Sequence, residues 1–276
     1  MSRRLAVAVI HGMGAQRKTH PDDSAAPSFS ADLRKRLRVE MGEHRFDAEV
    51  AWREVFWAKE LQDRQDAYAA AMRRVSRFGP LRRFVMHRLA DAAAYYPSKR
   101  SDSTYEKVHR RIDRVIEELE ADVAPDAPLL IAAHSLGGHM MSNYIWDLQA
   151  GHRTRPTAFQ RLESLGGMLT FGCNIPVFIF SHGTIEAIAY PGADRGRMVR
   201  PWWRNYYDAD DPLGYPLTPV GGGYAALAGA GEMQDYRINA GSWLLHSWNF
   251  LSHNGYWDDR GFARRVAAFI DEIMAA

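Results

Sequence analysis

The stretch LLIAAHSLGGHMM, from Leu129 to Met141, constrains the fold of this chain more than any other feature. Five apolar residues run into a His-Ser pair, and two glycines follow after a single leucine. The apolar run predicts a buried strand, and the residues after it predict a helix, although a glycine in a helix costs about 1 kcal/mol relative to alanine. The glycines therefore indicate a sharp turn in which strand and helix approach closely around Ser135.

The rest of the chain alternates short apolar strands with amphipathic helices. Further strands are expected at Leu5–Ile10, Phe46–Trp57, Met168–Cys173 and Asp235–Ala240, helices at Ala31–Met41, Tyr105–Ala121, Gly137–Leu148 and Gly261–Met274, and a mobile glycine-rich segment at Gly221–Gly231. Strands that alternate with helices predict an α/β fold with a mostly parallel central sheet covered by helices on both faces.

The composition fits a soluble protein without a disulfide framework. The chain has 276 residues, a formal net charge of +2 and one cysteine, Cys173, so that charge gives no sign of nucleic-acid binding and no disulfide can form within the chain. No apolar run approaches the roughly 20 residues that a membrane-spanning helix needs. The run Leu5–Ile10 is too short for a signal peptide. We expect a cytoplasmic protein.

The turn at Ser135 resembles a known catalytic motif. Ala133-His134-Ser135-Leu136-Gly137 is similar to the nucleophile elbow of the α/β-hydrolases, G-x-S-x-G, with alanine in place of the first glycine. The resemblance implies an α/β-hydrolase fold, one such domain over residues 1–276, and Ser135 as the catalytic nucleophile beside the free N–H groups of a helix. The alternative is that Ser135 is an ordinary helix N-cap.

A second turn follows the first expected strand, which ends in His11-Gly12-Met13-Gly14. In the α/β-hydrolases an H-G dipeptide at this place opens the loop that supplies one oxyanion-hole amide. The resemblance therefore implies that the backbone N–H groups of Met13 and Leu136 form the oxyanion hole. The alternative is a glycine turn that merely ends a strand. The G-x-G lacks the third glycine of a dinucleotide-binding motif, so no nucleotide cofactor is expected.

A serine nucleophile needs a histidine base and a carboxylate that orients the histidine. In this fold the order along the chain is serine, acid, histidine. That order leaves His246 and His253 as candidate bases and favours the acidic turn that carries Asp208, Asp210 and Asp211. The alternative for His246 is a packed loop histidine, and for Asp208 and Asp210 it is turn capping.

Two further segments resemble the DDHD-domain phospholipases. Asp211-Pro212-Leu213-Gly214-Tyr215 is similar to their D-P-V-A-Y segment, and Ser252-His253-Asn254-Gly255-Tyr256-Trp257 is similar to their S-H-x-S-Y-W segment. In that family these segments carry the acid and the histidine, so the resemblance implies Asp211 and His253 as the triad partners of Ser135. The chain departs from the pattern at Gly255 and after Tyr215.

The apolar residues of Leu61–Tyr96 recur at near-helical spacing, which predicts helix. Insertions between strands often build a cap over the site in the α/β-hydrolases, so the resemblance implies that residues 58–104 form a helical cap inserted into the domain. Part of this insertion is strongly basic and carries no acidic residue; its arginines are Arg73, Arg74, Arg77, Arg82, Arg83 and Arg88. A basic amphipathic helix can bind an anionic membrane. The alternative is a packed cap with solvated arginines.

Together these features predict a serine hydrolase that cleaves a carboxylic ester through an acyl-enzyme on Ser135. One form of this hypothesis has a lipid-like ester as the substrate. The alternatives are acyl transfer by the same triad and a catalytically silent fold that binds a protein or a membrane. The predicted chemistry needs no metal or other cofactor, and the histidines lack the H-E-x-x-H and Cys-His spacings of metal sites.

Overall fold

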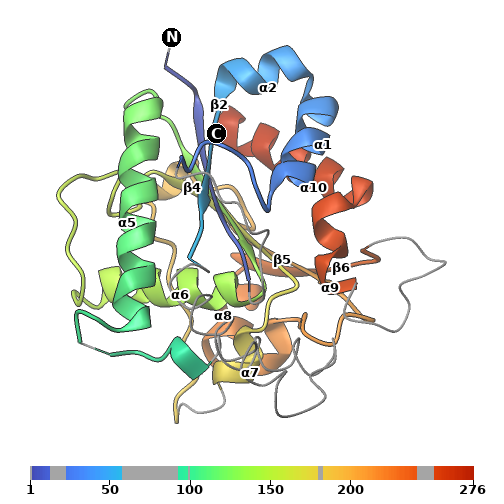
Figure 1. The fold of residues 1–276 in the computed structure, drawn as a ribbon. Coiled ribbons are helices and arrows are strands. Elements are labelled where there is room, and N and C mark those ends of the chain that lie inside the picture. Colours follow the sequence, from blue (N-terminus) through green and yellow to red (C-terminus); the bar gives the residue numbers. More distant parts are fainter. Residues whose placement is uncertain (1, 13–22, 58–92, 99, 180–182, 241–251) are drawn as a thin grey trace, which may run out of the picture.

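A parallel β-sheet forms the centre of the computed structural model, which describes residues 2–12, 23–57, 93–98, 100–179, 183–240 and 252–276 (Figure 1). Its strands are β1 (Leu5–Ile10), β2 (Val50–Val55), β3 (Leu129–His134), β4 (Leu165–Phe171), β5 (Trp203–Asp208) and β6 (Met233–Ile238). Their order across the sheet is β2-β1-β3-β4-β5-β6, and every neighbouring pair is parallel.

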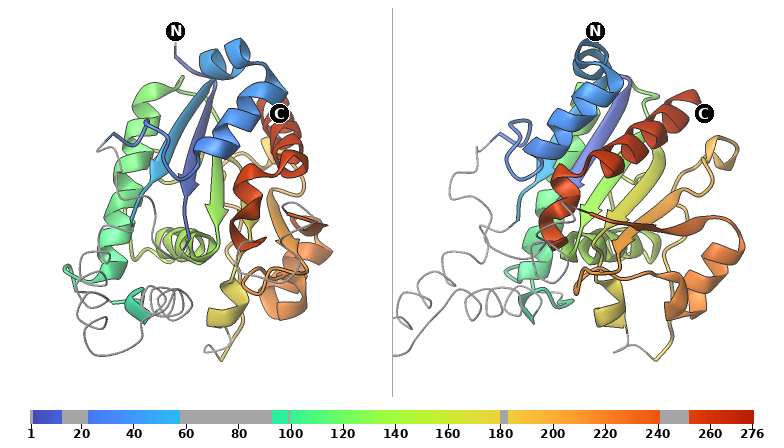
Figure 2. Two further views of the ribbon diagram at one scale, coloured as in Figure 1. Left: turned by 45° about the vertical axis from the view of Figure 1, so that its right-hand side comes forward. Right: turned by 90° about the vertical axis from the view of Figure 1, so that its right-hand side faces the viewer.

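Helices cover both faces of this sheet, so the predicted fold class is confirmed (Figure 2). One face packs against α1 (Ala31–Met41), α2 (Glu43–Glu49) and α10 (Arg260–Ala275), and the other packs against α5 (Thr104–Asp122), α6 (Leu136–Gln149) and α8 (Gly222–Gly229). Strands with both faces buried need apolar side chains at successive positions, which explains why the residues LAVAVI of β1 are all apolar and all buried.

The remaining elements are short. They are the helices α7 (Ile175–Ile179) and α9 (Ser252–Gly255) and the 3₁₀ turns η1 (Arg195–Arg197), η2 (Thr218–Val220) and η3 (Tyr256–Asp258). Helix α5 covers the helix expected at Tyr105–Ala121. Helix α5 turns Val108, Ile112 and Val115 into the core, and the Ser103 side chain caps its first turn by accepting a hydrogen bond from the Glu106 amide.

The structure differs from expectation at two segments. A strand was expected over Phe46–Trp57, but the chain is helical until Glu49 and the strand begins at Val50. Phe46 is buried against Trp52 and is the only buried residue of α2. A single buried residue fits the apolar pattern of a helix and that of a strand equally well. The segment Gly221–Gly231 was expected to be mobile and is mostly the helix α8, in which Tyr224 is buried in the core.

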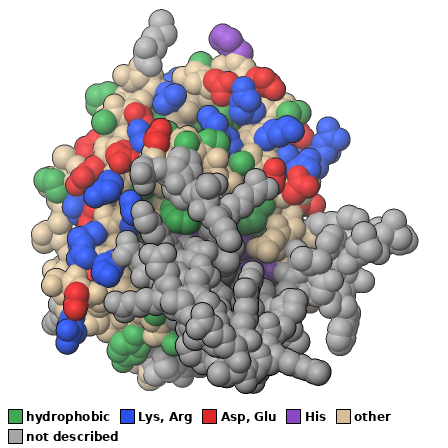
Figure 3. All heavy atoms as spheres, viewed as in Figure 1, with side chains coloured by type: hydrophobic (Ala, Val, Ile, Leu, Met, Phe, Trp, Pro, Cys, Tyr) green, Lys and Arg blue, Asp and Glu red, His purple; other side chains and the backbone are tan. Residues whose placement is uncertain are grey.

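The expected helical cap lies largely outside the described residues, as do all six arginines of its basic part. Across the part of the chain that the structure does describe, we find no helix long and apolar enough to cross a membrane. Basic and acidic side chains are interspersed on the described surface in the view of Figure 3. Many of them form ion pairs, such as Arg38 with Asp47 and Arg45 with Asp271.

The carboxyl ends of the parallel strands meet at one edge of the sheet, which is where α/β proteins place their sites. The register pairs Ile10 of β1 with Ala133 of β3 and His134 of β3 with Phe171 of β4. The turns that follow β1, β3 and β4 therefore begin side by side. The acidic turn begins after Asp208, at the same end of β5.

Candidate active site

Ser135 lies at the turn between β3 and α6 in a strained backbone conformation. Its φ is 55° and its ψ is −125°, a region that residues other than glycine rarely occupy and that is associated with functional sites. Its amide donates a 3.0 Å hydrogen bond to the Phe171 carbonyl of the neighbouring strand. The Ser135 side chain makes no N-cap hydrogen bond to α6, so the N-cap alternative has no support in the geometry.

Glycines let the backbone close around this serine. An added Cβ at Gly137 would lie 2.8 Å from the His11 carbonyl oxygen and 2.9 Å from that of Ile10. An added Cβ at Gly12 would lie 2.3 Å from the Cβ of Ser135. Gly12 of the H-G pair and Gly137, the last residue of the elbow, are therefore both needed for β1, β3 and α6 to pack together.

Ser135, His253 and Asp211 form a continuous hydrogen-bonded chain. His253 Nε2 lies 2.8 Å from Ser135 Oγ, and His253 Nδ1 lies 3.0 and 2.9 Å from the two carboxylate oxygens of Asp211. A carboxylate only accepts hydrogen bonds, so Nδ1 carries the proton and Nε2 is left to accept from the serine hydroxyl. All three residues are buried, which shields this chain of hydrogen bonds from water.

Asp208, Asp210 and Asp211 have different contacts in the structure. The Asp208 carboxylate accepts hydrogen bonds from the backbone amides of Asp210 and Ala240, so it stabilises the turn. Asp210 is exposed. Of the three aspartates that the sequence left open, Asp211 is the one that contacts His253.

Asp211 is held as an ionised acceptor by several donors. Burial alone would raise its pKa, but hydrogen bonding and charge from His253, the Leu213 amide and the Tyr256 hydroxyl outweigh burial and lower the pKa below its ordinary value. The Leu213 amide donates to Oδ1 at 2.9 Å and the Tyr256 hydroxyl donates to Oδ2 at 3.0 Å. The carboxylate is therefore ionised throughout the neutral pH range.

Tyr256 contacts Asp211, and the sequence did not predict this contact. Burial and then the charge of Asp211 raise the pKa of Tyr256, so its hydroxyl stays protonated and donates to Asp211. The same oxygen accepts a 2.9 Å hydrogen bond from the Asp208 amide. Tyr256 lies in the segment similar to S-H-x-S-Y-W, but nothing in that segment indicates that its hydroxyl contacts Asp211.

The two expected oxyanion-hole residues differ in what the structure describes. Leu136 is the first residue of α6, and its backbone N–H has no partner within the helix. Met13 lies outside the described residues. Gly12, the residue before Met13, packs closely against Ser135, because an added Cβ at Gly12 would lie 2.3 Å from Ser135 Cβ. His11 is buried, and its Nε2 accepts a hydrogen bond from the Trp57 amide at 3.2 Å.

His246 lies outside the described residues. Burial raises the pKa of the Cys173 thiol to about 12, so this cysteine is not a competing nucleophile at neutral pH. Within the described ranges, no cluster of histidine, cysteine or acidic side chains could hold a metal ion.

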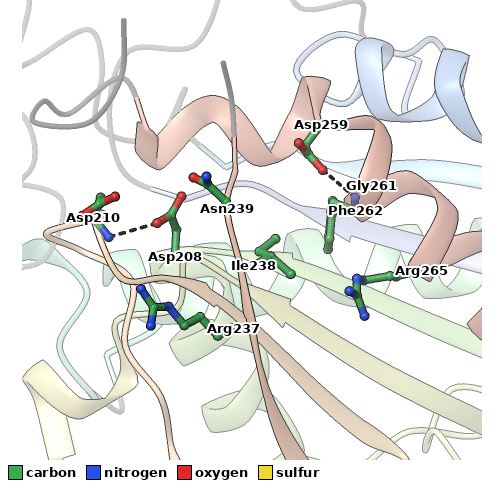
Figure 4. Close-up of a pocket in the computed structure, with 9 residues that line it drawn as sticks. All are labelled: Asp208, Asp210, Arg237, Ile238, Asn239, Asp259, Gly261, Phe262 and Arg265. Carbon is green, nitrogen blue, oxygen red and sulfur yellow. Dashed lines mark hydrogen bonds between the residues drawn. The ribbon is translucent and has the colours of Figure 1, made fainter. Parts of the chain in front are cut away.

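A hollow of about 520 Å³ adjoins the acidic turn (Figure 4). Its described walls come from the turn after β5, the end of β6 and the start of α10; they are Asp208, Asp210, Arg237, Ile238, Asn239, Asp259, Gly261, Phe262 and Arg265. Ser135, Asp211 and His253 are not among these residues. The hollow is therefore separate from the Ser135 site.

Neither a scan of protein-family models nor a search of curated proteins finds a match to this chain. Among solved structures, the chain is similar to a protein assigned to the alpha/beta superfamily of hydrolases from Xanthomonas campestris pv. campestris. The two are 12% identical, the match covers 96% of this chain and 99% of that one, and the TM-score is 0.42. A likeness this weak carries no information about activity.

Proposed function

We propose that this protein is a serine hydrolase that cleaves a carboxylic ester through an acyl-enzyme on Ser135. The observation that supports this most strongly is the continuous chain of hydrogen bonds from Ser135 through His253 to Asp211, with the serine at a strained strand-to-helix turn. A merely structural serine needs neither the strain nor the buried imidazole.

The first half of the reaction forms the acyl-enzyme. Ser135 Oγ attacks the ester carbonyl carbon while its proton moves to His253 Nε2. The carbonyl oxygen becomes an oxyanion, which the Leu136 amide and an amide of the loop after Gly12 stabilise; Met13 is the residue we assign there. The carbon–oxygen bond to the leaving group then breaks, and His253 gives its proton to the departing alcohol.

The second half releases the acyl group. Water attacks the acyl carbon, and His253 accepts one of its protons. A second oxyanion forms and collapses, the bond to Ser135 Oγ breaks, and the proton returns to that oxygen as the carboxylic acid leaves. Asp211 stays ionised throughout and stabilises the imidazolium. An acceptor alcohol in place of water would give acyl transfer by the same steps.

A fluorophosphonate probe tests the proposal directly. An activated serine displaces fluoride from the probe phosphorus and keeps the phosphonyl group, so intact mass spectrometry of the wild type should show one adduct. The Ser135→Ala variant should show none. A wild type that stays unlabelled in buffer, in detergent and with anionic vesicles would contradict the proposal, as would equal labelling of the variant.

The Gly12→Ala variant should lose most of its hydrolytic activity. The added Cβ would lie 2.3 Å from Ser135 Cβ and 2.8 Å from Ser135 Oγ. The backbone or the serine must move, which costs about 1–3 kcal/mol of folding free energy, and a displacement of about 1 Å at a reacting group costs about 10²-fold in rate. Ester hydrolysis and thermal unfolding measure both effects.

Gly229→Ala is the matched control, since an added Cβ there meets nothing within 4 Å. It should behave as the wild type in both assays. Wild-type activity in Gly12→Ala would mean that the contact between Gly12 and the nucleophile is not needed for catalysis.

A further inference from the structure

His134, the residue directly before the nucleophile, contacts His253. Its Nε2 lies 2.7 Å from the His253 backbone carbonyl oxygen. A carbonyl oxygen only accepts, so His134 Nε2 carries the proton and donates. The two imidazole rings lie 4.7 Å apart with an interplanar angle of 41°. The mechanism proposed above gives His134 no role.

The surroundings of His134 fix its ring. The side chain is 2% exposed. Its ring centroid lies 5.1 Å from that of Phe171 and 5.2 Å from that of Trp257. Phe171 is opposite His134 in the sheet register and Trp257 follows His253 by four residues. Phe171 and Trp257 also contact each other, with ring centroids 4.9 Å apart. A buried ring packed against these two rings and the His253 imidazole has little rotational freedom, so the direction of its N–H is fixed as well.

The contact matters because His253 lies on a short element. Helix α9 has four residues, Ser252–Gly255, which is too short for a helix to hold its own geometry. Two residues of the elbow are hydrogen-bonded to His253. The Ser135 side chain is bonded to its imidazole, and the His134 side chain is bonded to its backbone carbonyl oxygen. Fixing the carbonyl limits the backbone rotation that would carry the imidazole away from Ser135.

We propose that His134 is a positioning residue that ties the loop of the catalytic histidine to the nucleophile elbow. This inference rests on the proposed function. His134 itself takes no proton from substrate or serine; it acts through the backbone of His253. Among the described residues, Ser135 and Asp211 are hydrogen-bonded to the imidazole of His253 and His134 to its carbonyl oxygen. Tyr256 in turn donates a hydrogen bond to Asp211.

Two substitutions separate positioning from packing. His134→Leu fills the apolar surroundings but removes the donor, whereas His134→Gln keeps an N–H₂ group at a similar distance from the main chain. The leucine variant should lose about 10²-fold in kcat for ester hydrolysis, the usual cost of a displacement of about 1 Å at a reacting group, with KM nearly unchanged. The glutamine variant should recover most of that loss.

A second measurement does not depend on hydrolysis. In protein labelled with ¹⁵N-histidine, the proton on His253 Nδ1, buried against Asp211, should give a slowly exchanging, low-field resonance in the wild type and in His134→Gln. Its exchange should speed up in His134→Leu. His109→Leu removes a different buried histidine, one that contacts Tyr95, and should leave this resonance in place.

The outcomes are distinct. Wild-type kcat and wild-type exchange in His134→Leu would overturn the inference. An equal loss in the leucine and glutamine variants would also overturn it, because it would show a packing role. If the wild type hydrolyses nothing and takes up no probe, but exchange responds to the leucine variant as expected, the proposed function fails while the role of His134 stands.

Discussion

The His253→Ala variant is expected to hydrolyse ester substrates about 10⁵- to 10⁶-fold more slowly than the wild type, the loss that follows removal of the base from comparable triads. The reason is geometric: Nε2 of His253 lies 2.8 Å from Ser135 Oγ and is the atom placed to take its proton. The measurement is kcat/KM on a chromogenic ester series, together with the rate of fluorophosphonate labelling.

His246→Ala is the control, since chain order alone left both histidines open. It should keep wild-type activity. The opposite pattern, with a slow His246 variant and an active His253 variant, would show that the hydrogen bond from Ser135 to His253 is not the catalytic one. Thermal unfolding of both variants would show whether either change in rate comes from a loss of folded protein.

The Asp211→Asn variant is expected to lower kcat by about 10⁴-fold. An amide cannot stabilise the imidazolium, and its NH₂ group favours the tautomer of His253 that carries the proton on Nε2, which cannot act as a base. Steady-state kinetics of Asp211→Asn and Asp210→Asn measured side by side would check this. Asp210 is exposed, so its variant should match the wild type; the reverse order of effects would reject Asp211 as the acid.

The lowered pKa of Asp211 determines which group can account for the pH dependence of kcat/KM. The carboxylate stays ionised down to a pH below its ordinary value of ~3.9. A fall in kcat/KM between about pH 7 and pH 5 must therefore come from protonation of an imidazole, whose ordinary pKa is ~6.5, and not from loss of the acid.

Much of the fold follows from local patterns in the sequence. The strand at Leu5–Ile10 and the helix at Ala31–Met41 have the bounds that periodicity predicts. The prediction failed where local preference left a choice open. Helix α2 has one buried residue, Phe46, so packing against Trp52 and not a repeat of apolar positions selects the helix. In α8, the helix preference of the alanines and the burial of Tyr224 outweigh the low helix preference of the glycines.

The candidate site was only partly accessible to sequence reasoning. Ser135 follows from the strand-turn-helix pattern around it. Sequence order reduces the candidates for the acid and the base, but Asp208, Asp210 and Asp211 lie in one turn and differ only in where their side chains point. His134 and Tyr256 are hydrogen-bonded to groups 119 and 45 residues away in the chain, and no local pattern encodes a partner at that distance.

The wide spacing of Ser135, Asp211 and His253 along the chain has a consequence for folding. Ser135 and His253 are 118 residues apart, and His253 and Asp211 are 42 apart, so the site needs β3, β5 and the chain after β6 to be in register together. Contacts between such distant segments form late, because the loop entropy must be overcome first. Hydrolytic activity in a refolding chain therefore reports completion of the tertiary structure, whereas helix content reports only its early stages.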